Sequence, residues 1–347
     1  MTVDLTGGFA DSREFVFAKQ PDNPDMRESV NIWAWDDGGE AGFPRIGVEA
    51  VADQWETHDV QCNIAFASGR VLGIFEPGKV HDPLGADGQA RVLGAGPLSF
   101  ELVEPFRRWR MHLDGTAVDT TVQGQIDALR SGQHPSARVP VTLELEMEHV
   151  VPPWENGALR KEAAYVLENQ EEGALMGGPR FEQLFRMTGT FRVGDETREL
   201  RGGGLRIRRQ GIRRMARFWG HAWQSAVFPS GRAFGYIVYP DREDGLSTYN
   251  EGYLFEGDGE LVPARIVDAP WIRRIQPSGE DVSVVIETEH GTTSIAAESI
   301  MSTYHGMIPD DGVGLVLQQG IVRYTWDGES ANGMMERSMP SDRVDTK

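Results

Sequence analysis

The stretch Gly202–Tyr239 concentrates residues that could do chemistry, because an arginine-rich glycine turn runs directly into a segment studded with Trp and His. Side chains alternate between the two faces of a β-strand, so a strand here places Trp219, His221, Trp223 and Ser225 on one face. Histidine titrates near neutral pH, so His221 could exchange a proton within an aromatic pocket. This pattern predicts a catalytic role for His221 and ligand contacts for Trp219 and Trp223. The alternative is a structural histidine that is hydrogen-bonded inside a polar and aromatic core.

A second candidate set lies at residues 250–255, where Glu251, Tyr253 and Phe255 share one strand face by alternation. If a barrel brings that face towards His221, a carboxylate and a phenol could take and give protons during addition of water to an alkene, the reverse elimination, or a double-bond shift. We therefore count Glu251 and Tyr253 as catalytic candidates and Phe255 as a ligand contact. An ordinary amphipathic strand with Glu251 in solvent would have the same pattern.

An arginine cluster begins at the same glycine turn. Guanidinium groups bind carboxylates and phosphates through paired hydrogen bonds, so Arg206 is a ligand-binding candidate. However, Arg206 and Arg208 alternate with Leu205 and Ile207, which is typical of a solvent-exposed strand face. The pattern favours surface or ion-pair roles for most of the cluster, and a grip on an acidic ligand tail stays open. Its members are Arg201, Arg206, Arg208, Arg209, Arg213, Arg214 and Arg217.

Two further segments carry aromatic or titratable side chains. Trp33 and Trp35 share a strand face with Asn31, so they could line a cavity in the first half of the chain or fill its core. Tyr304 and His305 precede a glycine and an acidic turn, and a surface loop explains them.

No cofactor or metal is expected. Cys62 is the only cysteine, which excludes an intramolecular disulfide and a thiolate zinc cluster, and the histidines lack metal-ligand spacing. The glycine run at Gly202 is followed by alternating residues, so it lacks the helix of a phosphate-binding loop.

Composition restricts the partners. The 347 residues carry a formal net charge of −19, which disfavours nucleic acid and anionic membranes. Residues 1–20 lack the pattern of a signal peptide, and no apolar run approaches the ~20 residues that span a bilayer. We expect a cytoplasmic protein without membrane insertion, whose partner is a hydrophobic small molecule. A homodimer stays open.

Period-two alternation dominates the chain and predicts an all-β fold. In Val141–Val150, apolar residues alternate with Thr and Glu, as in a strand with one buried face. Tight-turn signals separate many such runs, which favours barrels or sandwiches. Short helices are expected only at Thr121–Leu129 and Pro179–Leu184. A stretch rich in Pro, Gly and acids follows Val150, and we place a domain boundary there, with domains at residues 1–165 and 166–347.

Several stretches together resemble bacterial proteins similar to carotenoid 1,2-hydratase, also called hydroxyneurosporene synthase. The resemblance implies two consecutive lipocalin-like, calycin-type antiparallel β-domains that enclose an apolar ligand site, often near their junction. Relatives in this superfamily include hydratases of isoprenoid or prenylated aromatic compounds and fungal pericyclic cyclases. It also makes Glu336, in the matching closing strand, a pocket candidate, with an ion pair to Arg323 or Arg337 as the alternative. The matching stretches are Arg27–Gly38, Gly42–Gly47, Leu98–Gly115, Gly202–Gly235, Trp326–Glu329 and Gly333–Ser338.

One departure from that family bears on chemistry. Its glycine turn usually continues as Arg-Asp-His-Ser-Trp-Gly-x-Arg, whereas this chain has Ile207 and Arg208 at the Asp and His positions. Acid–base work by that pair is therefore lost here, and His221 is the most plausible substitute.

Two functions of different class follow. One is a cofactor-free hydratase, dehydratase or isomerase of a hydrophobic terpenoid, steroid or polyketide-like molecule. The other is a non-catalytic carrier or sensor that kept the pocket and lost the acid–histidine pair. Convergence of at least two of His221, Glu251 and Tyr253 on one cavity would favour the enzyme, and their dispersal would favour the carrier.

Overall fold

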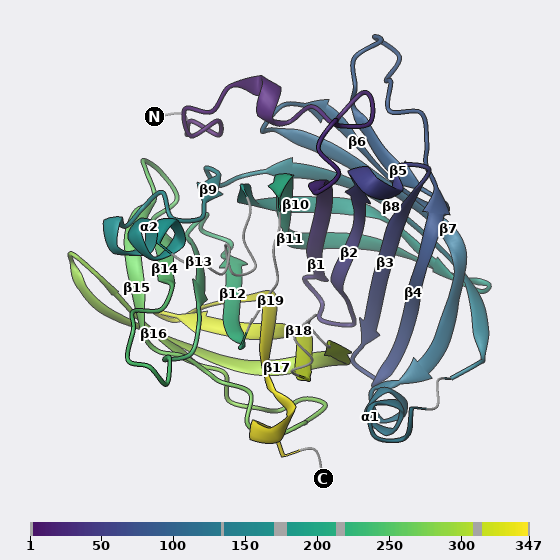
Figure 1. Ribbon diagram of the computed structural model, residues 1–347. Coiled ribbons are helices and arrows are strands. Elements are labelled where there is room, and N and C mark those ends of the chain that lie inside the picture. The colour runs from purple at the N-terminus through teal and green to yellow at the C-terminus, as the bar shows by residue number, and fades with distance from the viewer. Residues whose placement is uncertain (1–2, 133–134, 170–178, 213–218, 308–313, 346–347) are drawn as a thin grey trace.

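Two antiparallel β-sheets lying side by side form the body of the molecule (Figure 1). The computed structural model describes residues 3–132, 135–169, 179–212, 219–307 and 314–345. Within these ranges strands dominate and helices are short, so the all-β fold predicted from period-two alternation is confirmed.

The first sheet has 11 strands in the order β4-β3-β2-β1-β11-β10-β8-β7-β6-β5, and the short β9 pairs with β10. β4 also pairs with β7, so the sheet curls back on itself. Its strands are β1 (Met26–Asp36), β2 (Ala41–Val51), β3 (Thr57–Phe66), β4 (Arg70–Lys79), β5 (Val92–Ala95), β6 (Leu98–Glu104), β7 (Arg108–Thr121), β8 (Arg138–His149), β9 (Trp154–Glu155), β10 (Arg180–Val193) and β11 (Glu196–Ile212).

The second sheet is a closed barrel in which each strand pairs with its neighbour along the chain, and β19 pairs with β12 to close the ring. Its strands are β12 (His221–Val227), β13 (Ala233–Val238), β14 (Asn250–Phe255), β15 (Val262–Asp268), β16 (Val284–Thr288), β17 (Gly291–Met307), β18 (Leu315–Trp326) and β19 (Glu329–Pro340).

The two sheets divide the chain between Ile212 and His221. The reason is that β10 and β11, although they follow α2, pair with β8 and β1 of the first sheet. The division expected from composition, between residues 165 and 166, falls inside α2 (Lys161–Glu168).

Two helices accompany the sheets. α1 (Val122–Ser131) was predicted, and its ends have clear chemical causes: the Thr121 hydroxyl accepts a hydrogen bond from the Gly124 amide at 3.0 Å, and Gly132 ends it at φ 71°. The predicted helix at Pro179–Leu184 is wrong, because β10 begins at Arg180 and is paired on both sides. The remaining 3₁₀ turns are η1 (Asp11–Arg13), η2 (Ala52–Gln54) and η3 (Ser341–Arg343).

A tight turn sets the register of the closing hairpin. Asp327 and Gly328 both have positive φ, 48° and 81°, as a two-residue type I′ turn requires. Trp326 therefore pairs with Glu329, and counting along the two strands places Gln319 opposite Glu336.

Alternating side chains divide the interior into layers. The buried residues predicted in β8 point into the first sheet's core, which is filled with aliphatic and aromatic groups. A second cluster fills the barrel. A third lies between the sheets and takes the opposite faces of the central strands, with Trp33, Leu205 and Ile207 on one side and Trp223 and Tyr253 on the other. We call this third layer the domain interface.

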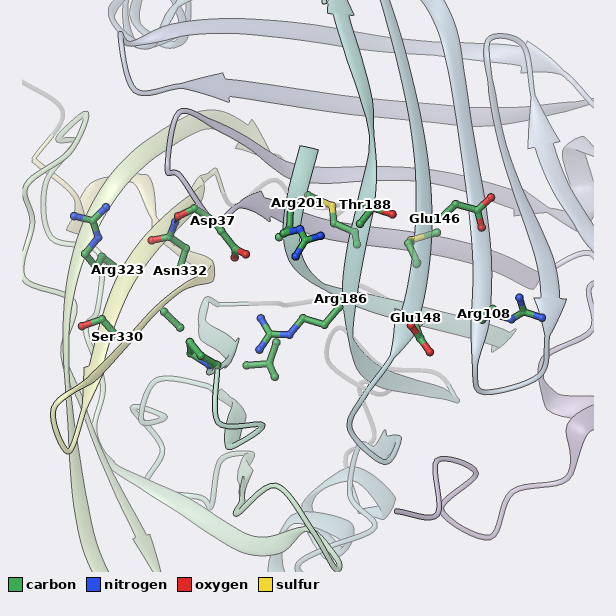
Figure 2. Close-up of a pocket in the computed structure, with 16 residues that line it drawn as sticks. Asp37, Arg108, Glu146, Glu148, Arg186, Thr188, Arg201, Arg323, Ser330 and Asn332 are labelled. Carbon is green, nitrogen blue, oxygen red and sulfur yellow. The ribbon is translucent and has the colours of Figure 1, made fainter. Parts of the chain in front are cut away.

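A cleft of about 750 Å³ opens at one end of the domain interface (Figure 2). Strands β7, β8, β10 and β11 form one wall, and the β18–β19 hairpin and the residues after β12 form the other.

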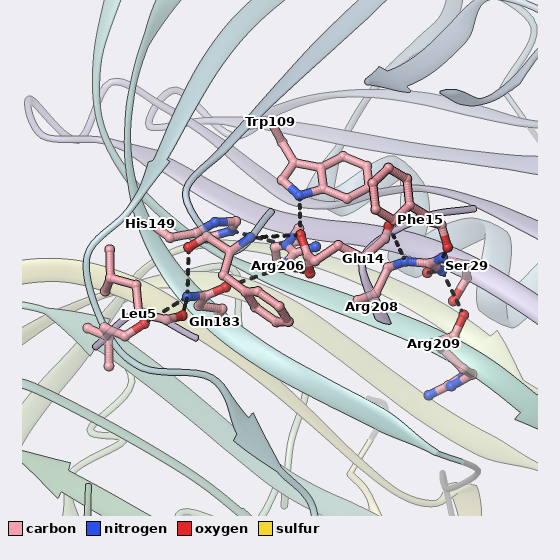
Figure 3. Close-up of polar contacts among 12 residues, drawn as sticks. Leu5, Glu14, Phe15, Ser29, Trp109, His149, Gln183, Arg206, Arg208 and Arg209 are labelled. Carbon is pink, nitrogen blue, oxygen red and sulfur yellow. Dashed lines mark hydrogen bonds and ion pairs between the residues drawn. The ribbon is translucent and has the colours of Figure 1, made fainter. Parts of the chain in front are cut away.

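The predicted solvent-exposed arginine face is wrong for Arg206 and Arg208, which are 0% and 1% exposed. The segment before β1 folds over them and supplies the Glu14 carboxylate (Figure 3), and β1 itself supplies Glu28. Arg206 Nη2 lies 2.8 Å from Glu14 Oε1, and Arg208 Nη2 lies 2.6 Å from Glu28 Oε1. Burial of charges in this environment requires such partners. Arg209 is also buried, Arg201 is exposed, and Arg213, Arg214 and Arg217 lie outside the described residues.

Glu14 is the centre of this buried group. Its second oxygen accepts hydrogen bonds from the Trp109 indole at 2.7 Å and the Phe106 amide at 3.4 Å. Arg206 in turn donates from Nε to His149 Nε2 at 3.0 Å. Burial, reinforced by the Arg206 charge, lowers the pKa of His149 well below its usual value, so the imidazole stays neutral and accepts this bond.

We expect Glu14→Gln to lower the free energy of unfolding by about 3 kcal/mol, because it leaves the Arg206 charge buried without a counter-ion. Glu146→Gln, which breaks an exposed pair with Arg110, is the matched control and should cost much less. Urea unfolding of both variants checks this. Equal losses would contradict the structural role assigned to Glu14.

Candidate functional site

The predicted aromatic and histidine face of β12 lies in the domain interface. Trp223 and Val227 pack against the first sheet, whereas Ala222 and Ala226 point into the barrel. Trp223 contacts Trp33 edge to face, with ring centroids 4.6 Å apart. The alternation read from the sequence is therefore correct, and the face it defines is directed at the neighbouring sheet.

His221 is buried and held on both ring nitrogens. Its Nδ1 lies 2.8 Å from the Ser338 hydroxyl and its Nε2 lies 3.2 Å from Glu336 Oε1. Because β12 pairs with β19, His221 stands opposite Ser338, and Glu336 lies two residues before Ser338, opposite Trp223. The close contact of Glu336 is thus with His221, not with Arg323 or Arg337.

Glu336 extends this contact into a chain of polar groups that joins the two sheets. Gln319 donates from Nε2 to Glu336 Oε2 at 2.5 Å, and Asn63 of β3 donates from Nδ2 to Gln319 Oε1 at 2.9 Å. Within the part of the chain that the structure describes, Asn63 Oδ1 is buried without a hydrogen-bond partner. We call Asn63, Gln319, Glu336, His221 and Ser338 the interface polar chain.

Two side chains, His221 and Arg45, favour the ionised form of Glu336. Burial opposes its ionisation, but the hydrogen bond and charge of His221, the charge of Arg45 and the Gln319 bond outweigh burial and lower the pKa of Glu336. Arg45 has φ 83°, unusual for a residue with a side chain, and lies in the stretch where the pairing of β2 shifts register. Glu336 is therefore a carboxylate at neutral pH.

His305, like Glu336, is influenced by the charge of Arg45. The surface loop predicted for Tyr304 and His305 is wrong. Both belong to β17, and Tyr304 is buried. Burial, assisted by the Arg45 charge, lowers the pKa of His305 to about 4 against the pull of Glu336. Its Nε2 is buried without a hydrogen-bond partner among the described residues.

Glu182 is a buried acid of the domain interface that sequence analysis missed. Its carboxylate accepts from Arg180 Nη2 at 2.8 Å and from the Trp223 indole at 3.0 Å. Burial raises the pKa of Glu182 to about 7, although Arg180 and Trp223 oppose the shift. The segment was read as a helix, and strand alternation is the signal that would have placed Glu182 with Leu184 on one face.

Glu251, Tyr253 and Phe255 share a buried face, as alternation predicts, and the solvent-exposed alternative is wrong for Glu251, which is 0% exposed. Five groups donate to the Glu251 carboxylate: the Trp154 indole, the Tyr249 hydroxyl and the amides of Gly157, Leu159 and Arg160. Glu251 thereby holds the segment after β9 against β14. Tyr253 packs on Trp154, with ring centroids 5.6 Å apart, and burial raises its pKa.

The other predicted ligand contacts are dispersed. Trp35 joins Trp33 in the domain interface. Trp219 is half-buried and donates to the Pro240 carbonyl at 2.8 Å. Arg206 lies on the other side of the first sheet with Glu14. None of the predicted site residues lines the 750 Å³ cleft.

The described residues lack two features that would point to a metal cofactor or a membrane span. They contain no cluster of three or more His, Cys, Asp or Glu side chains arranged to hold a metal ion. They also contain no helix with the length and apolar character needed to cross a membrane.

Comparison with known proteins places the chain in a family. The profile described as Domain of unknown function (DUF7064) matches residues 15–341, so the chain belongs to that family. None of the curated proteins matches the chain.

Two solved structures share the fold. One is a Nitrosomonas europaea protein provisionally named AttH, with 16% identity, a TM-score of 0.55, and coverage of 93% of this chain and 98% of that one. The other is kievitone hydratase from Nectria haematococca, with 9% identity, a TM-score of 0.52, and coverage of 98% and 96%. These likenesses confirm the predicted lipocalin-like antiparallel β fold.

We expect His305 to make folding less favourable as the pH falls from 6.5 to 4. The unfolded imidazole takes up its proton near pH 6.5, whereas folded His305 does so only near pH 4, so the unfolded state binds more protons in this window. Relative to His305→Gln, the wild type should lose ~1–3 kcal/mol across it. Urea unfolding at each pH measures the difference, with exposed His290→Gln as control. Parallel pH profiles for wild type and His305→Gln would count against a buried, neutral imidazole.

We expect Glu251→Gln to weaken the anchoring of residues 154–160, because the amide offers one acceptor where five donors now share a carboxylate. The expected loss of unfolding free energy is about 3 kcal/mol, together with faster proteolysis in this segment. Glu256→Gln, at an exposed position just after β14, is the matched control. Unchanged protection of the segment would contradict the anchoring role.

Proposed function

We propose that this member of the DUF7064 family is a cofactor-free enzyme that hydrates, dehydrates or isomerises a hydrophobic small molecule at the domain interface. The observation that carries the proposal is that three buried ionisable side chains, Glu182, His221 and Glu336, occupy strands around Trp223. Buried groups with perturbed pKa values and defined partners are typical of acid–base sites.

Addition of water to an alkene needs an acid that protonates carbon and a base that takes a proton from water. Glu182 suits the acid, because a carboxyl with a pKa of about 7 is protonated in a large fraction of molecules near neutral pH. His221 suits the base, because the Glu336 carboxylate would stabilise the imidazolium that forms. Elimination of water uses the same two groups in the opposite direction.

The aromatic side chains can stabilise the positive charge that develops on a substrate carbon. Protonation of an alkene gives a carbocation, and the face of an indole ring attracts cations. Trp223 contacts both Glu182 and Trp33, so acid and aromatic surface are adjacent. The proposed substrate is an apolar terpenoid, steroid or polyketide-like molecule, in keeping with the aromatic character of these side chains. Kievitone hydratase, which shares the fold, is a hydratase by name.

The residues at the family's Asp and His positions do other work in this protein. Ile207 packs in the domain interface, and Arg208 pairs with Glu28 beneath the segment before β1. Neither can act as an acid at neutral pH, so the proposal assigns proton transfer to Glu182 and the His221–Glu336 pair.

A non-catalytic carrier or sensor is the second candidate, and the state of Glu251 favours it. That carboxylate is saturated by five donors, so one of the three predicted catalytic groups has a structural role. A carrier would use the interface aromatics alone.

Incubation with a lipophilic extract followed by native mass spectrometry separates the candidates. We expect the wild type to release a product shifted by the mass of one water or isomerised, and His221→Ala and Glu182→Gln to retain ligand without converting it. Exposed His290→Ala is the matched control. Full turnover by His221→Ala would remove His221 from the mechanism, and retention of unaltered ligand by the wild type would favour the carrier.

A further inference from the structure

The charged cleft at the end of the domain interface is separate from the site proposed above. Its lining includes Val227 at the far end of β12, six residues from His221, which corresponds to roughly 20 Å along a strand. On β19 it takes Ser330 and Asn332, whereas the interface polar chain takes Glu336 and Ser338. The cleft therefore needs an explanation of its own.

Hydrogen bonds from both sheets build the cleft. Arg186 of β10 donates from Nη2 to the Phe228 carbonyl, just after β12, at 2.6 Å. Asn332 of β19 donates from Nδ2 to the carbonyls of Asp36 and Asp37, at the β1–β2 turn, at 3.0 and 3.2 Å. Each wall is thus tied to the opposite sheet, so the opening has a defined shape.

Three guanidinium groups line the cleft without a carboxylate partner. Among the residues that the structure describes, no Asp or Glu oxygen lies within 4.0 Å of Arg186, Arg201 or Arg323. By contrast, the fourth lining arginine, Arg108, contacts Glu104 at 3.1 Å. Within the described ranges, three arginines without a carboxylate contact thus surround one opening of a chain whose net charge is −19.

The pairing register of β10 and β11 explains why the Arg186 and Arg201 side chains lie on the same face of the first sheet. Arg201 stands next to Thr188 across β10 and β11, and Arg186 lies two residues before Thr188, so all three share the outer face of the first sheet. Figure 2 shows the Arg186 and Arg201 side chains directed into the opening and Asp37 facing them. Asp37 is exposed, yet partial desolvation raises its pKa against the opposing charges of Arg186 and Arg201.

The remaining residues that line the cleft are of two kinds, apolar and acidic. Val227, Pro229 and Ala331 offer an apolar wall beside the arginines. Asp37, Glu146 and Glu148 place negative charge at the rim, which disfavours a large polyanion such as a nucleic acid. A ligand with one anionic group and a short apolar body satisfies both.

We propose that this cleft binds a small amphiphilic carboxylate, with Arg186 and Arg201 holding the carboxylate and the apolar wall holding the body. Guanidinium forks match the geometry of a carboxylate, and charge-assisted bonds of this kind are the stronger ones. The cleft is distinct from the proton-transfer site and is independent of the proposed function.

Isothermal titration calorimetry of the full chain with octanoate, octanol and inorganic phosphate tests this. We expect octanoate to bind. Octanol and phosphate should each bind at least tenfold more weakly, because octanol lacks the carboxylate and phosphate lacks the apolar chain. The Arg201 side chain makes no hydrogen bond or ion pair to another described residue, so Arg201→Gln should weaken octanoate binding about tenfold, the loss of roughly one charge-assisted bond.

Arg265→Gln is the matched control, since Arg265 is exposed and paired with Glu287 far from the cleft. It should leave octanoate affinity unchanged. Equal binding of octanoate and octanol, binding of phosphate as tight as that of octanoate, or equal affinities of Arg201→Gln and Arg265→Gln would each overturn the proposal. His221→Ala should bind octanoate normally, which separates this result from the proton-transfer site.

Discussion

The strands where the two sheets meet are buried on both faces, and the rest of the structure depends on this constraint. Every residue of β12 is buried, with alternate side chains directed into the barrel and towards the first sheet. The same holds for the central part of β11. A strand in this position has no solvent face, so each polar side chain on it must find a partner inside the protein.

The interface polar chain and the Glu182 contacts supply such partners, and they also connect the sheets; among the described residues Asn63 Oδ1 and Ser225 Oγ stay without one. Asn63 meets Gln319 across the interface, and Glu182 meets Trp223. Because these bonds lie in a low-dielectric layer, burial raises the pKa of Glu182, whereas hydrogen bonds and nearby charges lower the pKa of Glu336. One constraint thus explains both the cohesion of the two sheets and the ionisable groups on which the proposed chemistry rests.

The same constraint separates correct from incorrect sequence predictions. Alternation in Val141–Val150 and on the face of Trp219, His221 and Trp223 was read correctly, because side-chain period is a local property of a strand. The helix at Pro179–Leu184 was wrong, since six residues are too few to distinguish a buried strand from a helix. Glu182 was missed for that reason.

The arginine cluster also shows what a local sequence pattern cannot predict, namely which face of a strand is exposed to solvent. Alternation of Arg206 and Arg208 with apolar residues correctly gave two faces, but the face assigned to solvent is covered by Glu14, Glu28 and the segment before β1. Those acids are far away in the sequence, and nothing near β11 indicates them. The position of a charged face is therefore decided by distant segments.

By itself, the amino-acid sequence determined the all-β class, the alternation of individual strands, the tight turn at Asp327 and the likeness to two-domain lipocalin-like proteins, because these depend on short-range periodicity and turn chemistry. Only the tertiary structure decided that β10 and β11 join the first sheet, that His221 pairs with Glu336, and that Glu251 serves as an anchor. These outcomes depend on contacts between residues far apart in the chain, which burial selects and which no local pattern encodes.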